Sequence, residues 1–270
     1  MPDASFRVLS QFFQDHLHFT PTPDLVDLFE ADLALVSPHL MLGALKEVSA
    51  SLKGRQVKEY REIIFGVYNR KVAEHAQLFP IFHSFETAFR STVCVELERY
   101  YGQSQWWESV YRVLRRGVAP TTITCIGGRT LPKDTAHLIG EIIWHIDGQN
   151  LQRNIVSTLT DGYRFTEQCK LSQIEKLIVH HWSVFGPAFA KHPRKLTRKD
   201  FQAKFSRVRE ARNEVYHHQS LSRMNQLVSV AKELLDYLDF SLGFVHHKIM
   251  TTRMPALKFA VPVESRHHTW

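Results

Sequence analysis

The dominant pattern in this sequence is apolar side chains at helical spacing. Between Ile81 and Val95, for example, apolar residues recur every three or four positions, the period of one face of an α-helix. The segment 117–132 contains Pro120, Gly127, Gly128 and the β-branched run Thr121-Thr122-Ile123-Thr124, and it is expected to form a loop or a small hairpin. The sequence therefore predicts an all-α fold, a bundle of about eight to ten helices.

The expected helices follow from this periodicity and from the residues that start and stop helices. Since proline disfavours helix in the residue before it, we expect the stretch 56–101 to form two helices that separate near Phe79-Pro80. Thr197 and Asp200 form a near capping box that begins a helix over 198–218. The other expected helices cover 6–17, a segment that begins at 22–24, and 39–52, 106–116, 134–146, 151–159, 172–185 and 221–248.

The length of 270 residues allows one large domain, and no break in composition marks a boundary. We predict a single domain, 1–270, with an N-terminal helical segment (1–54), a core (55–250) that holds the helix 198–218, and a C-terminal tail (251–270). No apolar run approaches the roughly 18 residues of a membrane span, and no basic leader precedes an apolar core. The expected location is the cytoplasm, where Cys94, Cys125 and Cys169 would be reduced and buried.

Positive charge is concentrated in one region of the chain. The whole chain carries a net charge of +7, and the run 191–212 has nine basic residues against Asp200 and Glu210, which is also +7. A solvated surface is the simplest explanation, but clustered lysine and arginine also suit a polyanion such as RNA. The candidate RNA-binding residues in this run are Arg194, Lys195, Arg198, Lys199, Lys204 and Arg207.

The same region ends in a motif with catalytic potential. Arg212 and Asn213 are followed, after three residues, by His217 and then by His218, in the pattern R-N-x-x-x-H. An arginine and a histidine separated by four to six residues would occur about 3 to 4 times by chance in such a chain, as in Arg70 and His75, but requiring asparagine after the arginine lowers this to below about 0.1.

These residue types suit metal-independent cleavage of RNA. The 2′-hydroxyl of RNA is an internal nucleophile, so an enzyme needs a proton-transfer group near neutral pH and a fixed positive charge for the phosphate. Histidine supplies the first and the bidentate guanidinium of arginine the second. Arg212 would stabilise the transition state, His217 would act as general acid or base, and Asn213, one turn before His217, would orient it.

The chain also resembles the Abi-like, abortive-infection branch of the HEPN superfamily of ribonuclease toxins. The resemblance rests on Tyr68-Asn69, the E-x-x-x-R spacing of Glu86 and Arg90, Tyr100-Tyr101-Gly102 followed by Trp106-Trp107, and the motif 212–218. It implies a HEPN-type helical bundle and an endoribonuclease toxin of an abortive-infection or toxin–antitoxin antiphage system. The implied partners are an RNA substrate, tRNA or mRNA, and an antitoxin of protein or RNA, with 2′,3′-cyclic phosphate products.

Helix geometry predicts that one chain is not enough for a compact site. Arg212 and His217 lie about 140° apart on an ideal helix, whereas Arg209, Asn213 and His217 form a narrower stripe. The family resemblance implies that two copies pair into a composite cleft, hence a homodimer, with Glu86, Arg90, His218 and Arg209 in support.

Simpler readings stay open for these residues. Arg212 and His217 can pair with acids such as Glu210 or Glu214, and Glu86 and Arg90 can form a plain intrahelical ion pair. In that case the protein would be a non-catalytic RNA-binding or regulatory protein.

Other motifs give little functional signal. Trp106, Trp107 and nearby tyrosines suit either core packing or base stacking. Adjacent histidines such as His180-His181 point about 100° apart on a helix and chelate poorly, so we expect no metal site. The chain has no glycine-rich phosphate loop, and we expect no cofactor.

Overall fold

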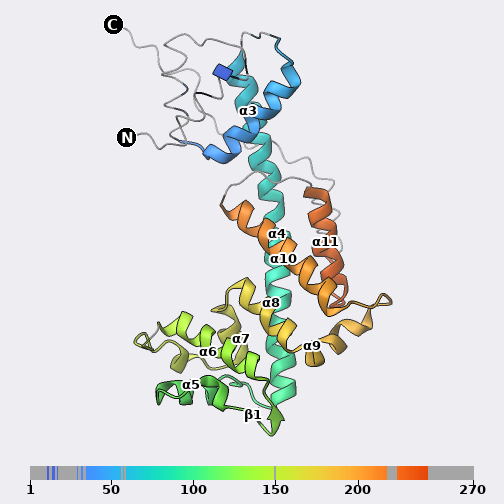
Figure 1. The fold of residues 1–270 in the computed structure, drawn as a ribbon. Coiled ribbons are helices and arrows are strands. Elements are labelled where there is room, and N and C mark those ends of the chain that lie inside the picture. Colours follow the sequence, from blue (N-terminus) through green and yellow to red (C-terminus); the bar gives the residue numbers. More distant parts are fainter. Residues whose placement is uncertain are drawn as a thin grey trace. The chain divides into compact units, whose positions relative to one another are not determined.

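The computed structural model describes residues 35–55, 57, 59–148, 150–217 and 224–242, together with the single residues 11, 14, 15, 17, 29 and 32. In this part of the chain it forms nine α-helices, α3 to α11, three short 3-10 helices and one two-stranded hairpin (Figure 1). The predicted all-α class is confirmed as a mainly helical fold, and a HEPN-type bundle stays a prediction. The expected helices 6–17 and 22–24 onward, and the tail 251–270, lie largely or wholly outside the described residues.

The chain divides into two compact units. Unit 1 contains Met1–Phe79, Asn213–Ser222 and His247–Trp270, and unit 2 contains Pro80–Arg212 and Arg223–His246. Both units therefore receive one part of α4 (Tyr60–Tyr101) and one part of α10 (Arg198–Tyr216). The assignment of 1–270 to a single domain stays a prediction, and each unit is described by itself.

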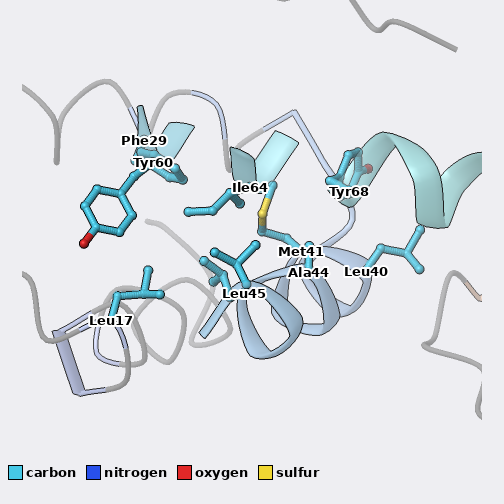
Figure 2. Close-up of a cluster of buried hydrophobic side chains, with 10 residues drawn as sticks. Leu17, Phe29, Leu40, Met41, Ala44, Leu45, Tyr60, Ile64 and Tyr68 are labelled. Atoms are coloured by element: carbon cyan, nitrogen blue, oxygen red, sulfur yellow. The ribbon is translucent and has the colours of Figure 1, made fainter. Parts of the chain in front are cut away.

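Unit 1 has a hydrophobic core between α3 (Pro38–Leu52) and the first part of α4. The α3 helix starts where the Ser37 side chain accepts a hydrogen bond from Leu40 N at 3.4 Å, and Pro38 occupies the first turn, which tolerates it. The helix ends at Lys53, which has a left-handed φ of 50°. Figure 2 shows the cluster that these helices bury: Leu17, Phe29, Leu40, Met41, Ala44, Leu45, Val48, Tyr60, Ile64 and Tyr68.

The predicted separation of two helices near Phe79-Pro80 is wrong, because α4 continues through Pro80. A proline inside a helix removes one hydrogen bond and costs about 3 kcal/mol. Leu78 before the proline, and Ile81 and Phe82 after it, are almost completely buried. Burial of such side chains contributes about 1.5–3 kcal/mol each, which offsets the cost of the proline.

Unit 2 continues from α4 into a run of shorter elements. In chain order these are α5 (Glu108–Arg115), the 3-10 helix Pro120–Thr122, β1 (Cys125–Ile126), β2 (Arg129–Thr130), α6 (Lys133–Asp147), the 3-10 helix Val156–Thr158, α7 (Gly162–Glu167), α8 (Leu171–His180), α9 (Trp182–Ala188), the 3-10 helix Phe189–Lys191, α10 and α11 (Met224–Asp236). The loop or hairpin expected in 117–132 is an antiparallel hairpin that turns at Gly127 and Gly128, both at positive φ. A Cβ at Gly127 would lie 2.0 Å from the carbonyl oxygen of Tyr101, so this turn requires glycine.

The predicted helix over 151–159 is wrong, because a buried carboxylate organises this segment as a loop. Asp147 Oδ1 accepts hydrogen bonds from the backbone N–H groups of Ile155 at 2.6 Å and Val156 at 3.0 Å. Leu151 and Asn154 have φ values of 52° and 54°, which no helix contains. Only the 3-10 turn Val156–Thr158 remains helical.

Two other predicted helices have different limits. The segment 172–185 is divided at His181 (φ −108°, ψ 35°) into α8 and α9. The helix expected over 221–248 ends at Asp236, where Phe240 N bonds back to Leu235 O at 3.0 Å and Asp239 takes a left-handed φ of 59°.

Phenylalanine rings pack α10, the helix that carries Arg212, against α4 within unit 2. Phe205 on α10 lies 5.0 Å from Phe85 and 5.1 Å from Phe89, measured between ring centroids. Phe201, one turn earlier, lies 5.9 Å from Phe89 and also packs on Phe189 and Trp182. These buried aromatic contacts fix the rotation of α10 and therefore decide which of its residues face away from the core.

Among the described residues, the structure contains no helix of the length and apolarity that crossing a membrane requires.

Candidate functional site

The motif residues lie near the end of α10. Thr197 begins this helix: its hydroxyl accepts from Asp200 N at 3.1 Å and donates to the Asp200 carboxylate at 2.6 Å. The helical hydrogen bonds extend one residue beyond Tyr216, since His217 N donates to Asn213 O at 2.9 Å. Asn213 and His217 are exposed, and His218 lies outside the described residues. The boundary of the units passes between Arg212 and Asn213, so the two halves of the motif are described separately.

In unit 2, Arg212 is held by Glu86 of α4. The Nε of Arg212 donates to Oε1 of Glu86 at 2.7 Å, a charge-assisted hydrogen bond. The Arg212 side chain keeps 29% of its surface exposed, against 17% for Glu86. The predicted alternative of a pair between Arg212 and its sequence neighbours, Glu210 or Glu214, stays a prediction.

Glu86 also connects Arg212 to a second arginine. Its Oε2 lies 3.7 Å from Arg90, the intrahelical pair expected from their spacing. Arg90 donates to the carbonyl oxygen of Cys169 at 2.7 Å and to that of Thr166, both next to the C-terminus of α7. Arg90 thus neutralises the negative end of a helix and ties Glu86 to a third segment. The result is a chain of contacts, from α7 through Arg90 and Glu86 to Arg212.

In unit 1, the end of α10 presents three neighbouring side chains. Asn213, Tyr216 and His217 are spaced i, i+3 and i+4 and share one helical face. Tyr216 contacts Phe79 of α4 edge to face, with ring centroids 5.1 Å apart. Neither Phe79 nor Tyr216 was predicted as a site residue, although an aromatic residue stands directly before the motif histidine in the sequence.

Arg209, predicted to support the site, neutralises a buried carboxylate. Its Nη1 lies 2.5 Å from Oε2 of Glu175, whose side chain is 5% exposed, and Ser206 Oγ donates to the other oxygen of Glu175 at 2.8 Å. A weaker contact of 3.6 Å reaches Glu210. Because an unpaired buried carboxylate is costly, this arrangement fixes α10 against α8.

The six predicted RNA-binding residues fall into two groups. Lys204 pairs with Glu233 at 2.5 Å and lies over the ring of Tyr237, and Arg207 donates to Gln226 at 3.0 Å. Arg207 is nevertheless exposed, as are the other four side chains, which lie around the start of α10: Arg194, Lys195, Arg198 and Lys199. Positive charge near a helix N-terminus destabilises the helix. Helix stability therefore does not explain why these four basic residues lie at the start of α10.

Several residues considered in the sequence have structural positions. Trp106 and Trp107 are buried, and Trp107 stacks on Phe165 at 4.6 Å, which favours core packing over base stacking. Arg70 of the second arginine–histidine match pairs with Glu47 and Glu74, and its partner His75 is buried.

The buried pair Tyr101 and His181 is a further polar feature of unit 2. The phenol oxygen lies 2.6 Å from Nε2 of the imidazole. Burial lowers the pKa of His181 to about 4 and raises that of Tyr101 above its ordinary value. The pair is therefore neutral at physiological pH.

The cysteines only partly match their predicted burial. Cys94 and Cys169 are buried, and desolvation raises the pKa of each thiol to about 12, which makes both inert. The prediction is wrong for Cys125, which is exposed because it lies at the edge of the short hairpin.

A groove of about 430 Å³ lies along the exposed side of α4 in unit 2. Its lining residues include His83, Thr87, Ser91 and Phe240, and none of the predicted site residues is among them. Among the described residues, no three histidine, cysteine or acidic side chains gather in a metal-binding arrangement.

Comparison with protein-family models, with curated proteins and with solved structures gives no match for this chain.

Proposed function

We propose that this protein is a metal-independent endoribonuclease that uses Arg212 and His217 in a homodimeric cleft. The observation that supports this most directly is the Glu86–Arg212 contact at 2.7 Å. It restrains a partly exposed guanidinium four residues before Tyr216, while His217 is exposed one residue beyond the helix. A fixed cation and an accessible imidazole are the two groups that phosphodiester cleavage needs.

The proposed reaction is an internal transesterification. The 2′-oxygen bonds to phosphorus and gives its proton to a base, and the P–O5′ bond breaks as the leaving oxygen receives a proton from an acid. The products are a 2′,3′-cyclic phosphate and a 5′-hydroxyl end. One step accepts a proton while the other donates one, so two histidines complete the cycle more readily than one. A second copy of the chain would supply the second His217, and Asn213 would orient the ring.

We also propose a biological role for this protein. It rests on the resemblance to Abi-like HEPN toxins, and it places the protein in an abortive-infection or toxin–antitoxin system with an antitoxin partner. The RNA substrate would be tRNA or mRNA in the cytoplasm. The exposed basic group at the start of α10 supports an RNA substrate by its charge.

The decisive experiment is cleavage of total RNA in EDTA by wild type, Arg212→Ala and His217→Ala. We expect discrete cuts with cyclic phosphate ends in wild type and losses of about 100-fold or more in both variants, the usual scale for catalytic groups. His137→Ala, an exposed histidine on α6, is the matched control and should cut normally. Specific activity should also fall when the protein is diluted below its dimer dissociation constant, and a fully active monomer would contradict the composite cleft.

A non-catalytic RNA-binding protein is the second candidate, and the ion pair between Glu86 and Arg212 also fits this function. An arginine paired with Glu86 can be a purely structural link between α4 and α10. In that case RNA stays intact with every variant, and substitution of Arg194, Lys195, Arg198 and Lys199 weakens RNA binding while His217→Ala does not.

A further inference from the structure

Two partly exposed aromatic side chains meet next to the motif histidine. Phe79 is 39% exposed and Tyr216 is 41% exposed, and their rings pack at 70° with centroids 5.1 Å apart. Both belong to unit 1, as do Asn213 and His217. Trp106 and Trp107 of unit 2, by contrast, are buried and have no surface for a ligand.

The last turn of α10 sets the spacing of Asn213, Tyr216 and His217. Tyr216 and His217 follow Asn213 by three and four residues, and the bond from His217 N to Asn213 O keeps this turn helical. The Cβ atoms of Tyr216 and His217 each lie about 5–6 Å from that of Asn213, whereas the two adjacent side chains project about 100° apart. A nucleotide whose base lies on the Tyr216 ring would therefore reach the His217 imidazole across Asn213.

We propose that the Tyr216–Phe79 pair is a stacking platform for one unpaired RNA base beside the phosphate that is cleaved. This inference rests on the proposed function and names its substrate class: RNA that is single-stranded at the cleavage site, in a loop, a bulge or an end. Bases inside a duplex are stacked on both faces and do not reach an aromatic side chain. Unpaired bases stack on tyrosine or phenylalanine with little sequence preference.

The chemistry of the pair fits a nucleotide. The edge-to-face packing places the two rings at an angle, so a flat base on one ring meets the edge of the other, a favourable aromatic arrangement. The exposed His217 next to Tyr216 in the sequence is the group that would act on the ribose 2′-hydroxyl.

A binding experiment with RNA that resists cleavage tests this inference separately from catalysis. The probes are a 2′-O-methyl single strand of mixed sequence and the same strand annealed to its complement, titrated into the full-length protein. We expect Tyr216→Leu to weaken binding of the single strand about tenfold, the usual size of one lost stack, with less than about twofold change for the duplex. Tyr216→Phe keeps the ring and should bind within about twofold of wild type.

Two controls separate stacking from folding. Tyr163→Leu removes a similarly exposed tyrosine, 38%, on α7 and should leave binding unchanged. If Tyr216→Leu is unfolded, ultraviolet crosslinking of a 4-thiouridine-labelled single strand to the wild-type protein gives the answer. We expect the crosslinked peptide to contain Tyr216 or Phe79.

Three outcomes would overturn the platform. One is wild-type affinity of a folded Tyr216→Leu variant for the single strand, and another is crosslinking at other peptides alone. The third is a Tyr216→Leu variant that changes from dimer to monomer with unchanged affinity, because the pair would then be a protein contact. If total RNA is not cut but single-strand binding depends on Tyr216, the nuclease proposal fails and the platform stands. If RNA is cut and single-strand binding does not depend on Tyr216, the nuclease proposal stands and the platform fails.

Discussion

The carboxylate of Glu86 and the guanidinium of Arg212 are joined at 2.7 Å, although 126 positions separate them in the sequence. The same carboxylate lies 3.7 Å from Arg90, which is bound to carbonyl groups beside the end of α7. A catalytic arginine gains from such a restraint, because a guanidinium already held in place needs no reorganisation in the transition state. The contact thus gives Glu86 a positioning role in the proposed reaction.

Replacement of Glu86 tests that role. Glu86→Gln keeps the shape but removes the charge, and we expect kcat for RNA cleavage to fall about 10- to 100-fold with a smaller change in KM. Glu86→Asp should recover part of the activity. The matched control is Glu108→Gln, which removes the acid of the exposed pair with Arg112 on α5. Normal kcat in a folded Glu86→Gln variant would leave Glu86 with a structural role only.

Glu175 is expected to matter for stability. Its side chain is 5% exposed and receives Arg209 and Ser206, so Glu175→Ala leaves a partly buried guanidinium without its counter-charge. We expect a loss of about 3 kcal/mol in the free energy of unfolding. Glu233→Ala removes the partner of Lys204 from a more exposed pair and should cost less than about 1 kcal/mol. Equal losses in urea denaturation would contradict this difference.

The free energy of unfolding should fall in mild acid because of His181. Unfolded histidine binds a proton near pH 6.5, whereas the pKa of buried His181 is about 4. Between these values the unfolded state binds more protons, so stability decreases as the pH falls from 6.5 towards 4 and changes little further below. The total effect is on the order of 3 kcal/mol.

Urea denaturation at pH 7 and pH 5 measures this effect. His181→Gln should be less stable at pH 7, since it loses the bond to Tyr101, but its stability should depend less on pH. His137→Gln changes an exposed histidine and should keep the wild-type pH dependence. The same pH dependence in all three proteins would exclude His181 as its source.

Helix periodicity predicted most of this fold because it reports which face of each segment is buried. It failed where a tertiary contact outweighed a local rule. Pro80 is accepted because the buried stripe continues on both sides of it, and 151–159 is a loop because Asp147 takes its backbone N–H groups. Neither contact has a local signature in the sequence.

The contacts of the candidate site could also be predicted from the sequence only in part. The spacing of Arg212, Asn213 and His217 could be read from the sequence, since it is a property of one helix. The partner of Arg212 could not, because many carboxylates compete and only packing selects Glu86. For the same reason the basic run 191–212 did not reveal that Lys204, Arg207 and Arg209 are engaged within the protein.

The exposed and the paired residues of the basic run should contribute differently to the salt dependence of RNA binding. Each contact with a phosphate of single-stranded RNA contributes about −0.7 to the slope of log K against log salt concentration. If Arg198 and Lys199 each bind one phosphate, the double variant Arg198→Ala/Lys199→Ala should lose about 1.4 from the magnitude of this slope. Lys204→Ala/Arg207→Ala removes the same charge from residues paired with Glu233 and Gln226 and should change the slope much less. Fluorescence anisotropy over a range of salt concentrations measures both slopes. An equal loss in the two double variants would mean that binding responds to net charge alone and not to the exposed group at the start of α10.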